Sequence, residues 1–288
     1  MALLQALVNG VLVGGVYALV SVGLTLVFGV MEIVNFAQGE FLMLGMYIAY
    51  LGFVGFHLDP LVSALLAFGL LFGLGMAIEA GLVRPVLKGS QLGHIFLTVG
   101  LSVALQNGAL ALFGGDFRAV QTPYQVSALA LGPVRLSVPY LLAFGWAGAV
   151  SAALHLFLTR TGFGRAMRAV AANSTAATLC GVNVARVRMV AFALGCGLAG
   201  LAGAVILPYA YVFPTVGFQY IVIMFTVVVL GGLGNVNGAI AAALLVGVVQ
   251  SVSTLFFPTV LENLLVFTLF VLVLSIRPAG LLGRAHAL

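Results

Sequence analysis

The segment TRTGFGRAMRAVAANSTAATLCGVNVARVR, from Thr159 to Arg188, is the one long polar interruption in an otherwise strongly apolar chain. Five of the eleven basic residues of the chain lie in it, and it contains no Asp or Glu. Cytoplasmic loops of membrane proteins carry such an excess of Arg and Lys. We therefore predict that this segment is a cytoplasmic loop between membrane spans.

The same segment has the sequence signals of two short helices. Residues 165–172 are rich in good helix formers, and Asn173 or Ser174 is suited to cap a second helix that ends near Cys180. Gly181 is the residue type that most often follows the end of a helix. A folded basic loop of this kind offers a surface on which another protein docks.

The composition indicates a polytopic membrane protein, and we expect residues 1–288 to form a single transmembrane domain. The chain is 63% hydrophobic and 6% charged, whereas soluble domains are about 25% charged. The net charge of +5 does not indicate nucleic acid as a partner, because the basic residues stand at the ends of apolar runs, where they orient the chain and meet anionic membrane lipid. Cys180 and Cys196 are too few for a disulfide framework or a metal site.

Apolar runs of spanning length predict an all-α fold with eight or nine transmembrane helices. The number is eight if 217–257 is one broken unit. The N-terminal run is too long for a signal peptide and is interpreted as a retained span. The runs cover residues 3–28, 37–56, 61–83, 93–113, 137–158, 187–212, 217–233, 236–257 and 261–276.

The basic residues also predict the orientation of the spans. Arg84 and Lys88, the segment from Thr159 to Arg188, and Arg277 with Arg284 should face the cytoplasm. The loops at 57–59, 116–135 and 212–217 are then external, and so is the N-terminus. If residues 30–39 are re-entrant instead of a crossing, the N-terminus moves inside.

Two stretches interrupt the apolar pattern: NFAQGE at 35–40 and GGLGNVNG at 231–238. Glycine at this density disfavours a continuous helix. Non-helical backbone at membrane depth is tolerated where it lines a cavity, so both are candidates for broken or re-entrant segments along a solute path. Ordinary turns at the cytoplasmic surface are the other interpretation, and the sequence leaves both open.

Charged side chains are expected to be peripheral. Glu40 and Glu79 are predicted near the cytoplasmic ends of their spans, with Glu79 paired to Arg84, and no acidic residue is predicted at a span centre. The chain contains no phosphate-binding G-x-x-x-x-G-K-[ST] motif, and its four His have no partners at metal-ligand spacing. We therefore expect neither an enzyme nor a metal site, and energy for uphill transport would come from a partner or an ion gradient.

The whole chain resembles the permease subunit of bacterial branched-chain amino acid ATP-binding-cassette importers, the Liv type. The resemblance rests on five stretches in the expected order: VFGVMEIVNFAQGEF (27–41), GLSVALQNGALALFGGDFR (100–118), GRAMRAVAANSTAATLCGVNV (164–184), VVLGGLGNVNGAIAAALLVG (228–247) and IRPAGLLG (276–283).

The resemblance implies that the cytoplasmic loop contains a coupling helix, near 173–180. Importer permeases carry a loose Glu-Ala-Ala pattern followed, after three residues, by Gly. Here Ala176, Ala177 and Gly181 match it, while Thr175 stands where Glu is usual. The implied ATPase-coupling residues are Arg165, Arg168, Ala176, Ala177 and Gly181.

The resemblance also implies an assembly in the bacterial inner membrane. Its partners would be two ATPase subunits that bind the ATP, a second and related permease chain, and an external solute-binding protein. This chain would hold no cofactor itself and would translocate Leu, Ile, Val or related neutral amino acids by alternating access. The polar residues expected along the path are Asn35, Gln38, Gln106, Asn107, Asn235 and Asn237.

Two other classes remain open. A self-contained secondary transporter or channel, for small neutral solutes such as amides or urea, would work without ATPase subunits and would need a charged residue at mid-membrane. An integral membrane enzyme would need clustered His and carboxylate residues near one interface.

Overall fold

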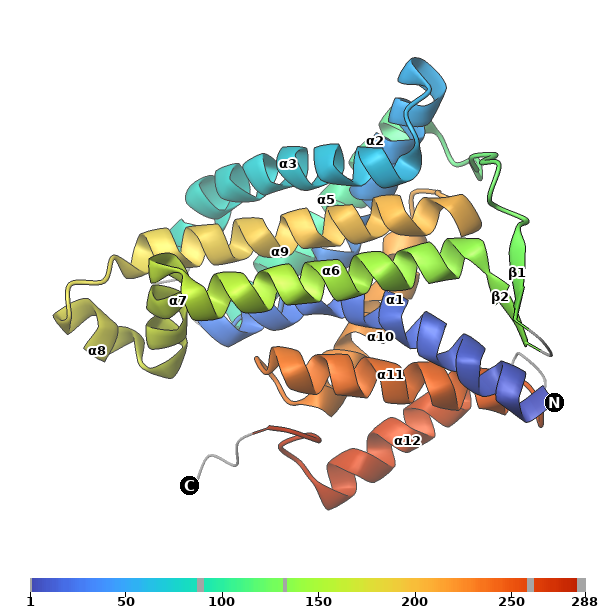
Figure 1. Cartoon of the computed structure of the whole chain (residues 1–288). Helices are drawn as coiled ribbons and strands as arrows, with labels where there is room; N and C mark the ends of the chain where they lie inside the picture. Colours follow the sequence, from blue (N-terminus) through green and yellow to red (C-terminus); the bar gives the residue numbers. More distant parts are fainter. Residues whose placement is uncertain (1, 87–90, 132–133, 258–261, 284–288) are drawn as a thin grey trace.

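The computed structural model describes residues 2–86, 91–131, 134–257 and 262–283, and these form an all-α membrane protein (Figure 1). Seven helices are long and apolar enough to cross a membrane, and α10 and α12 are shorter apolar helices. The principal helices are α1 (Ala2–Met31), α2 (Gln38–Phe56), α3 (Pro60–Ile78), α5 (Gln91–Phe113), α6 (Val138–Arg160), α9 (Val184–Ile206), α10 (Val216–Gly231), α11 (Val236–Ser253) and α12 (Glu262–Ile276).

Shorter elements join them. A π-helix, η1 (Glu79–Val83), and α4 (Arg84–Val86) continue α3, and a 3-10 turn, η2 (Leu207–Tyr209), ends α9. The loop from Thr159 to Arg188 contains α7 (Gly162–Ala172) and α8 (Ser174–Leu179), as predicted from its cap residues. The nine predicted spans therefore correspond one to one with the nine apolar helices.

The core of the bundle is built on α1 and α9. Of the central apolar stretches, 83% of α1 and 89% of α9 are buried, against 17% of α5. Helix α1 packs along α11 and α9, and α9 also packs against α2 and α3. In the isolated chain α5 is thus a peripheral helix with a large exposed face.

Glycine permits the closest of these contacts. A Cβ on Gly195 would lie 3.0 Å from the carbonyl oxygen of Gly23, and one on Gly203 would lie 2.1 Å from that of Leu42. The face of α9 that carries Gly195, Ala199 and Gly203 is therefore used for internal packing. By contrast, a Cβ on Gly69 would meet no atom within 4 Å.

The two ends of the bundle separate the loops as the charge pattern predicts. The side chain of Gln5 exchanges hydrogen bonds with the backbone of Arg135, and Arg118 forms a β-bridge with Val212. The N-terminus and the predicted external loops therefore lie at one end, and α8 lies at the other (Figure 1). Which end faces the cytoplasm stays a prediction, and Lys88 and Arg284 lie outside the described residues.

One element was not predicted: a small antiparallel hairpin of β1 (Ala128–Leu131) and β2 (Val134–Ser137) in the loop before α6. Each strand has four residues, too few for an alternating pattern to stand out from the surrounding apolar sequence. The hairpin is held by Gln5, a contact across 130 residues of sequence that only the folded chain provides.

Candidate functional site

The break between α1 and α2 covers residues 32–37, three residues before the predicted start. Its polar side chains bond to one another: Asn35 Nδ2 donates to Gln38 Oε1 at 3.0 Å, and Asn35 Oδ1 accepts from the Ala37 amide at 3.1 Å. Both side chains are fully buried. Asn35 and Gln38 therefore stabilise the non-helical backbone, whose polar groups would otherwise be unsatisfied in an apolar interior.

This break lies inside the bundle. Gln38 Nε2 donates to the carbonyl oxygen of Gly195 at 2.8 Å, and Gly195 is the middle residue of α9 (Val184–Ile206). Helix α2 therefore begins beside the middle of a spanning helix. The prediction of a broken segment at membrane depth is confirmed here, and the alternative of a surface turn is wrong for this stretch.

Glu40 also lies at mid-bundle depth, which corrects the prediction that it sits near a cytoplasmic end. Its Oε1 accepts a hydrogen bond from Ser102 Oγ at 3.2 Å, and Ser102 is the middle residue of α5 (Gln91–Phe113). Only 3% of Glu40 is exposed. The expectation that no acidic residue occupies a span centre is wrong, because it placed the start of α2 at the surface.

A row of polar residues on α5 faces this region. Thr98 Oγ1 donates to the carbonyl oxygen of Val34 in the break at 3.2 Å, Ser102 contacts Glu40, and Gln106 follows one turn later. Spacing by four residues puts all three on one helical face. Sequence reasoning singled out Gln106 but missed Thr98 and Ser102, although the spacing was the signal that would have found them.

Gln106 and Asn107 line a cavity of about 390 Å³ at the C-terminal half of α5. The opposite wall comes from the loop before α10, with Phe213, Pro214 and Thr215. Two of the six predicted path residues thus share a cavity. Asn107 Nδ2 also donates to the carbonyl oxygen of Val103 at 2.8 Å within its own helix.

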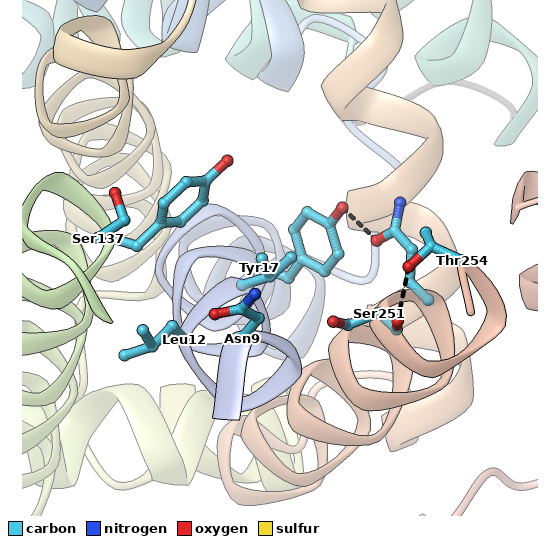
Figure 2. A pocket seen from close by; sticks show the side chains of 9 residues that line it. Asn9, Leu12, Tyr17, Ser137, Ser251 and Thr254 are labelled. Carbon is cyan, nitrogen blue, oxygen red and sulfur yellow. Dashed lines mark hydrogen bonds between the residues drawn. The ribbon is translucent and has the colours of Figure 1, made fainter. Parts of the chain in front are cut away.

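A second cavity, of about 340 Å³, opens between α1, α6 and α11 near the N-terminus (Figure 2). Its wall includes Asn9, Tyr17 and Ser251, and the Tyr17 hydroxyl donates to Gln250 Oε1 on α11. That bond joins two core helices. None of the six predicted path residues lines this cavity.

The stretch at 231–238 contains a short turn, residues 232–235, between α10 and α11. Asn235 caps α11 by accepting from the Gly238 amide at 3.1 Å, and its Nδ2 donates to the carbonyl oxygen of Leu282 at 2.7 Å. Asn237 is exposed. The backbone here is an ordinary turn, which was the second interpretation of this stretch. A role for Asn235 and Asn237 in the solute path stays a prediction.

The predicted coupling helix is α8, which projects beyond the ends of the spanning helices (Figure 1). Asn173 is its cap, accepting from the Ala176 amide at 2.9 Å. Gly181 ends it with φ +81°, the left-handed conformation that favours glycine. Arg165, Arg168 and Ala176 are exposed, whereas Ala177 is buried and anchors α8.

Glu79 does not form the predicted surface pair with Arg84. It is fully buried in the π-helix η1, and neither carboxylate oxygen has a hydrogen-bond partner among the described residues. Arg84 and Arg188 are its charged neighbours. Within the same described ranges, no three His, Cys, Asp or Glu side chains are grouped closely enough to hold a metal ion.

Comparison with known proteins identifies the family. The family described as the permease component of branched-chain amino acid transport systems matches residues 6–275. The permease protein BraD of a high-affinity branched-chain amino acid transport system of Pseudomonas aeruginosa is 33% identical over 98% of this chain and 96% of its own. The LivH permease proteins of Salmonella typhimurium and Escherichia coli K12 are 31% and 30% identical over the same shares.

No solved structure matches this chain significantly. The family match nonetheless covers almost the whole sequence, and the multi-pass helical fold agrees with it. The chain belongs to the family of branched-chain amino acid transport system permease components.

Proposed function

We propose that this chain is the membrane-spanning permease subunit of an ATP-binding-cassette importer that carries Leu, Ile, Val or related neutral amino acids across the bacterial inner membrane. The observation that carries the proposal is α8, a capped helix that projects from the bundle end where the basic loop lies. An importer permease without an ATPase site of its own needs such a surface to receive movement from ATPase subunits.

Helix α8 is built to dock. Leu179 is 85% exposed, and an apolar side chain of this size at the tip of a protruding helix is suited to insertion into a partner's groove. Arg165 and Arg168 lie exposed on the neighbouring helix α7. The partners proposed for this surface are two ATPase subunits, which hold the ATP.

The solute path is proposed to run along α5, between this chain and a second, related permease. In the isolated chain most of α5 is exposed, and it bears the amides of Gln106 and Asn107. Amide side chains in a membrane are stabilised when they face a protein partner or a water-filled path. An external solute-binding protein would deliver the solute at the end that carries the N-terminus.

Transport is then alternating access: closure of the ATPases moves α8, and the attached helices α7 and α9 transmit that movement to the core. Helix α9 begins five residues after α8 ends and contacts α1, α2 and α3. A displacement of the loop therefore reaches α1 and α2, the two helices that the break at 32–37 joins.

The test is purification of the tagged chain in mild detergent from its native cells, followed by identification of the co-purified chains and assay of ATP hydrolysis. We expect ATPase subunits and a second permease to co-purify, and ATP-dependent uptake of L-leucine after reconstitution with the binding protein. Uptake by this chain alone in liposomes without ATP would instead establish a secondary transporter or channel.

A further inference from the structure

Glu40 is a buried carboxylate with only one of its two oxygens hydrogen-bonded. Its Oε1 accepts from Ser102, but its Oε2 has no hydrogen-bond partner, and Glu40 forms no ion pair with any residue that the structure describes. Burying a carboxylate costs free energy unless a hydrogen-bonded or charged partner compensates. Ionisable residues at membrane depth are therefore functional candidates by default.

The amino ends of two helices lie beside Glu40 and offset part of the cost of burying its charge. Glu40 lies in the first turn of α2, and the first turn of α10 touches it, since a Cβ on Gly217 would lie 2.7 Å from Glu40 Oε2. The amino ends of helices carry partial positive charge and stabilise nearby anions. The amino ends of two helices thus lie beside the Glu40 carboxylate. No cation in the described part of the chain forms an ion pair with it.

One hydrogen bond and about one helical turn separate this carboxylate from the cavity on α5. Ser102, its hydrogen-bond donor, is one turn, about 6 Å, from the cavity-lining Gln106 on the same helical face. Across the cavity, Thr215 is two residues from Gly217. Glu40 does not line the cavity itself, but the two residues beside its carboxylate, Ser102 and Gly217, are close in sequence to residues that do.

We propose that Glu40 binds the ammonium group of the solute as it passes from the cavity into the bundle. This rests on the proposed function and identifies the part of the amino acid that this chain recognises, whereas amides and urea carry no ammonium group and would not bind here. The free Oε2 accepts from the ammonium, while Ser102 holds Oε1. The contact is a charge-assisted hydrogen bond, which is stronger than a neutral one in a water-poor site.

Gly217 allows α10 to approach the Glu40 carboxylate closely, because it has no side chain. A side chain at this position would crowd Oε2, because its Cβ would lie 2.7 Å from that oxygen. A Cβ would also lie 2.7 Å from the backbone of Gly39. Gly217→Ala should therefore lower uptake even though Glu40 is intact.

The experiment measures ATP-dependent uptake of radiolabelled L-leucine by the complete reconstituted complex. Glu40→Gln keeps the shape and removes the charge, and we expect uptake to fall at least tenfold while the ATPase subunits still co-purify. Glu40→Asp should retain an intermediate rate. The matched control is Glu32→Gln, the same charge change at an exposed position of the break, with uptake within twofold of wild type.

Leucine uptake by Glu40→Gln within twofold of wild type would overturn the proposal. A wild-type complex that takes up no leucine would contradict the proposed function itself, so the two failures are distinguishable. If Glu40→Gln fails to assemble, the wild-type complex provides the test.

In that case Glu40 is labelled with dicyclohexylcarbodiimide, a carboxyl-directed apolar reagent, and the modification is followed by mass spectrometry. L-leucine should slow labelling of Glu40 at least threefold, whereas 4-methylpentanoate, which has the same carbon skeleton without the amino group, should not. Equal protection by the two compounds, or protection by neither, would contradict an ammonium site.

Discussion

The side chain of Gln38 donates a 2.8 Å hydrogen bond to the backbone carbonyl of Gly195, 157 residues further along the chain. The bond attaches the first residue of α2 to the middle of α9. It sets the depth at which α2 begins, and with it the depth of Glu40 two residues later. The position of the candidate site therefore depends on this contact.

Gln38→Leu should destabilise the fold by about 2 kcal/mol, because it leaves buried polar groups of Gly195 and Asn35 without their partner. Unfolding in detergent can be followed by the reactivity of the buried thiol of Cys196 in a Cys180→Ser background. The control is Gln106→Leu, which removes no hydrogen bond found in the described chain. Equal melting temperatures for the two variants would contradict the structural role of Gln38.

Gly45→Ala should impair folding. Its Cβ would lie 2.1 Å from the carbonyl oxygen of Gly200 and 2.4 Å from the Cα of that residue, and backbone in a packed helix pair has little room to yield. Overpacking of this kind costs about 1–3 kcal/mol or more. The measurement is the yield of monodisperse protein and its melting temperature.

Gly69→Ala is the matched control for Gly45→Ala, since its Cβ would meet nothing within 4 Å. There the change from Gly to Ala inside a helix should be neutral or stabilise by up to about 1 kcal/mol. A loss of stability at Gly69 as large as that at Gly45 would mean that close helix packing is not the cause.

Gly181→Val should disrupt coupling without preventing membrane insertion. The residue has φ +81°, where a non-glycine residue is strained by about 1–2 kcal/mol, while a Cβ there would meet open space. The expected effect is loss of co-purified ATPase subunits or of stimulated ATP hydrolysis, because α8 no longer ends in the same geometry.

Gly181→Asn separates backbone conformation from bulk, because Asn tolerates the left-handed region and is of similar size to Val. It should retain at least half of the wild-type coupling. If Gly181→Val transports normally, α8 is not the docking element. If Gly181→Asn is as defective as Gly181→Val, any side chain at this position blocks docking.

Tyr124→Phe tests the packing of the loop before β1 onto the start of α3. The Tyr124 hydroxyl donates to Asp59 Oδ1 at 2.9 Å, and the same oxygen caps α3 by accepting from the Leu61 amide at 2.8 Å. Removing the hydroxyl should lower stability at neutral pH by about 1 kcal/mol.

The stability difference between wild type and Tyr124→Phe depends on pH through the Tyr124 pKa. Burial and the adjacent Asp59 carboxylate raise this pKa well above its usual range. The native state therefore keeps a proton that the unfolded chain loses above about pH 10. The stabilisation by Tyr124 is complete below that pH and declines as the pH rises further. Melting temperatures of wild type and Tyr124→Phe should differ by a constant amount from pH 7 to pH 9 and converge above pH 10.

Much of this architecture could be predicted because it depends on local signals. Apolar run lengths identified all nine helices, and the Asn173 cap and Gly181 stop correctly bounded α8. These features follow from the length that a bilayer requires and from the conformations that Asn and Gly favour, so no distant residue is needed to predict them.

The site itself could not be predicted in the same way. Gln106 and Asn107 were found because amides are conspicuous in an apolar span, but Ser102 and Thr98 were missed because a hydroxyl can satisfy itself within its own helix. Glu79 was expected to pair at the surface, yet the turns of η1 and α9 enclose it completely.

By itself the sequence determined a multi-pass helical membrane protein with a basic, capped loop, since hydropathy and charge act residue by residue. Only the tertiary structure decided that α2 begins at mid-bundle depth and that Glu40 faces Ser102 beside Gly217. The reason is physical: the depth of a residue is set by the helices against which it packs. Those neighbours are brought together by contacts between distant segments, 62 residues apart for Glu40 and Ser102 and 157 apart for Gln38 and Gly195.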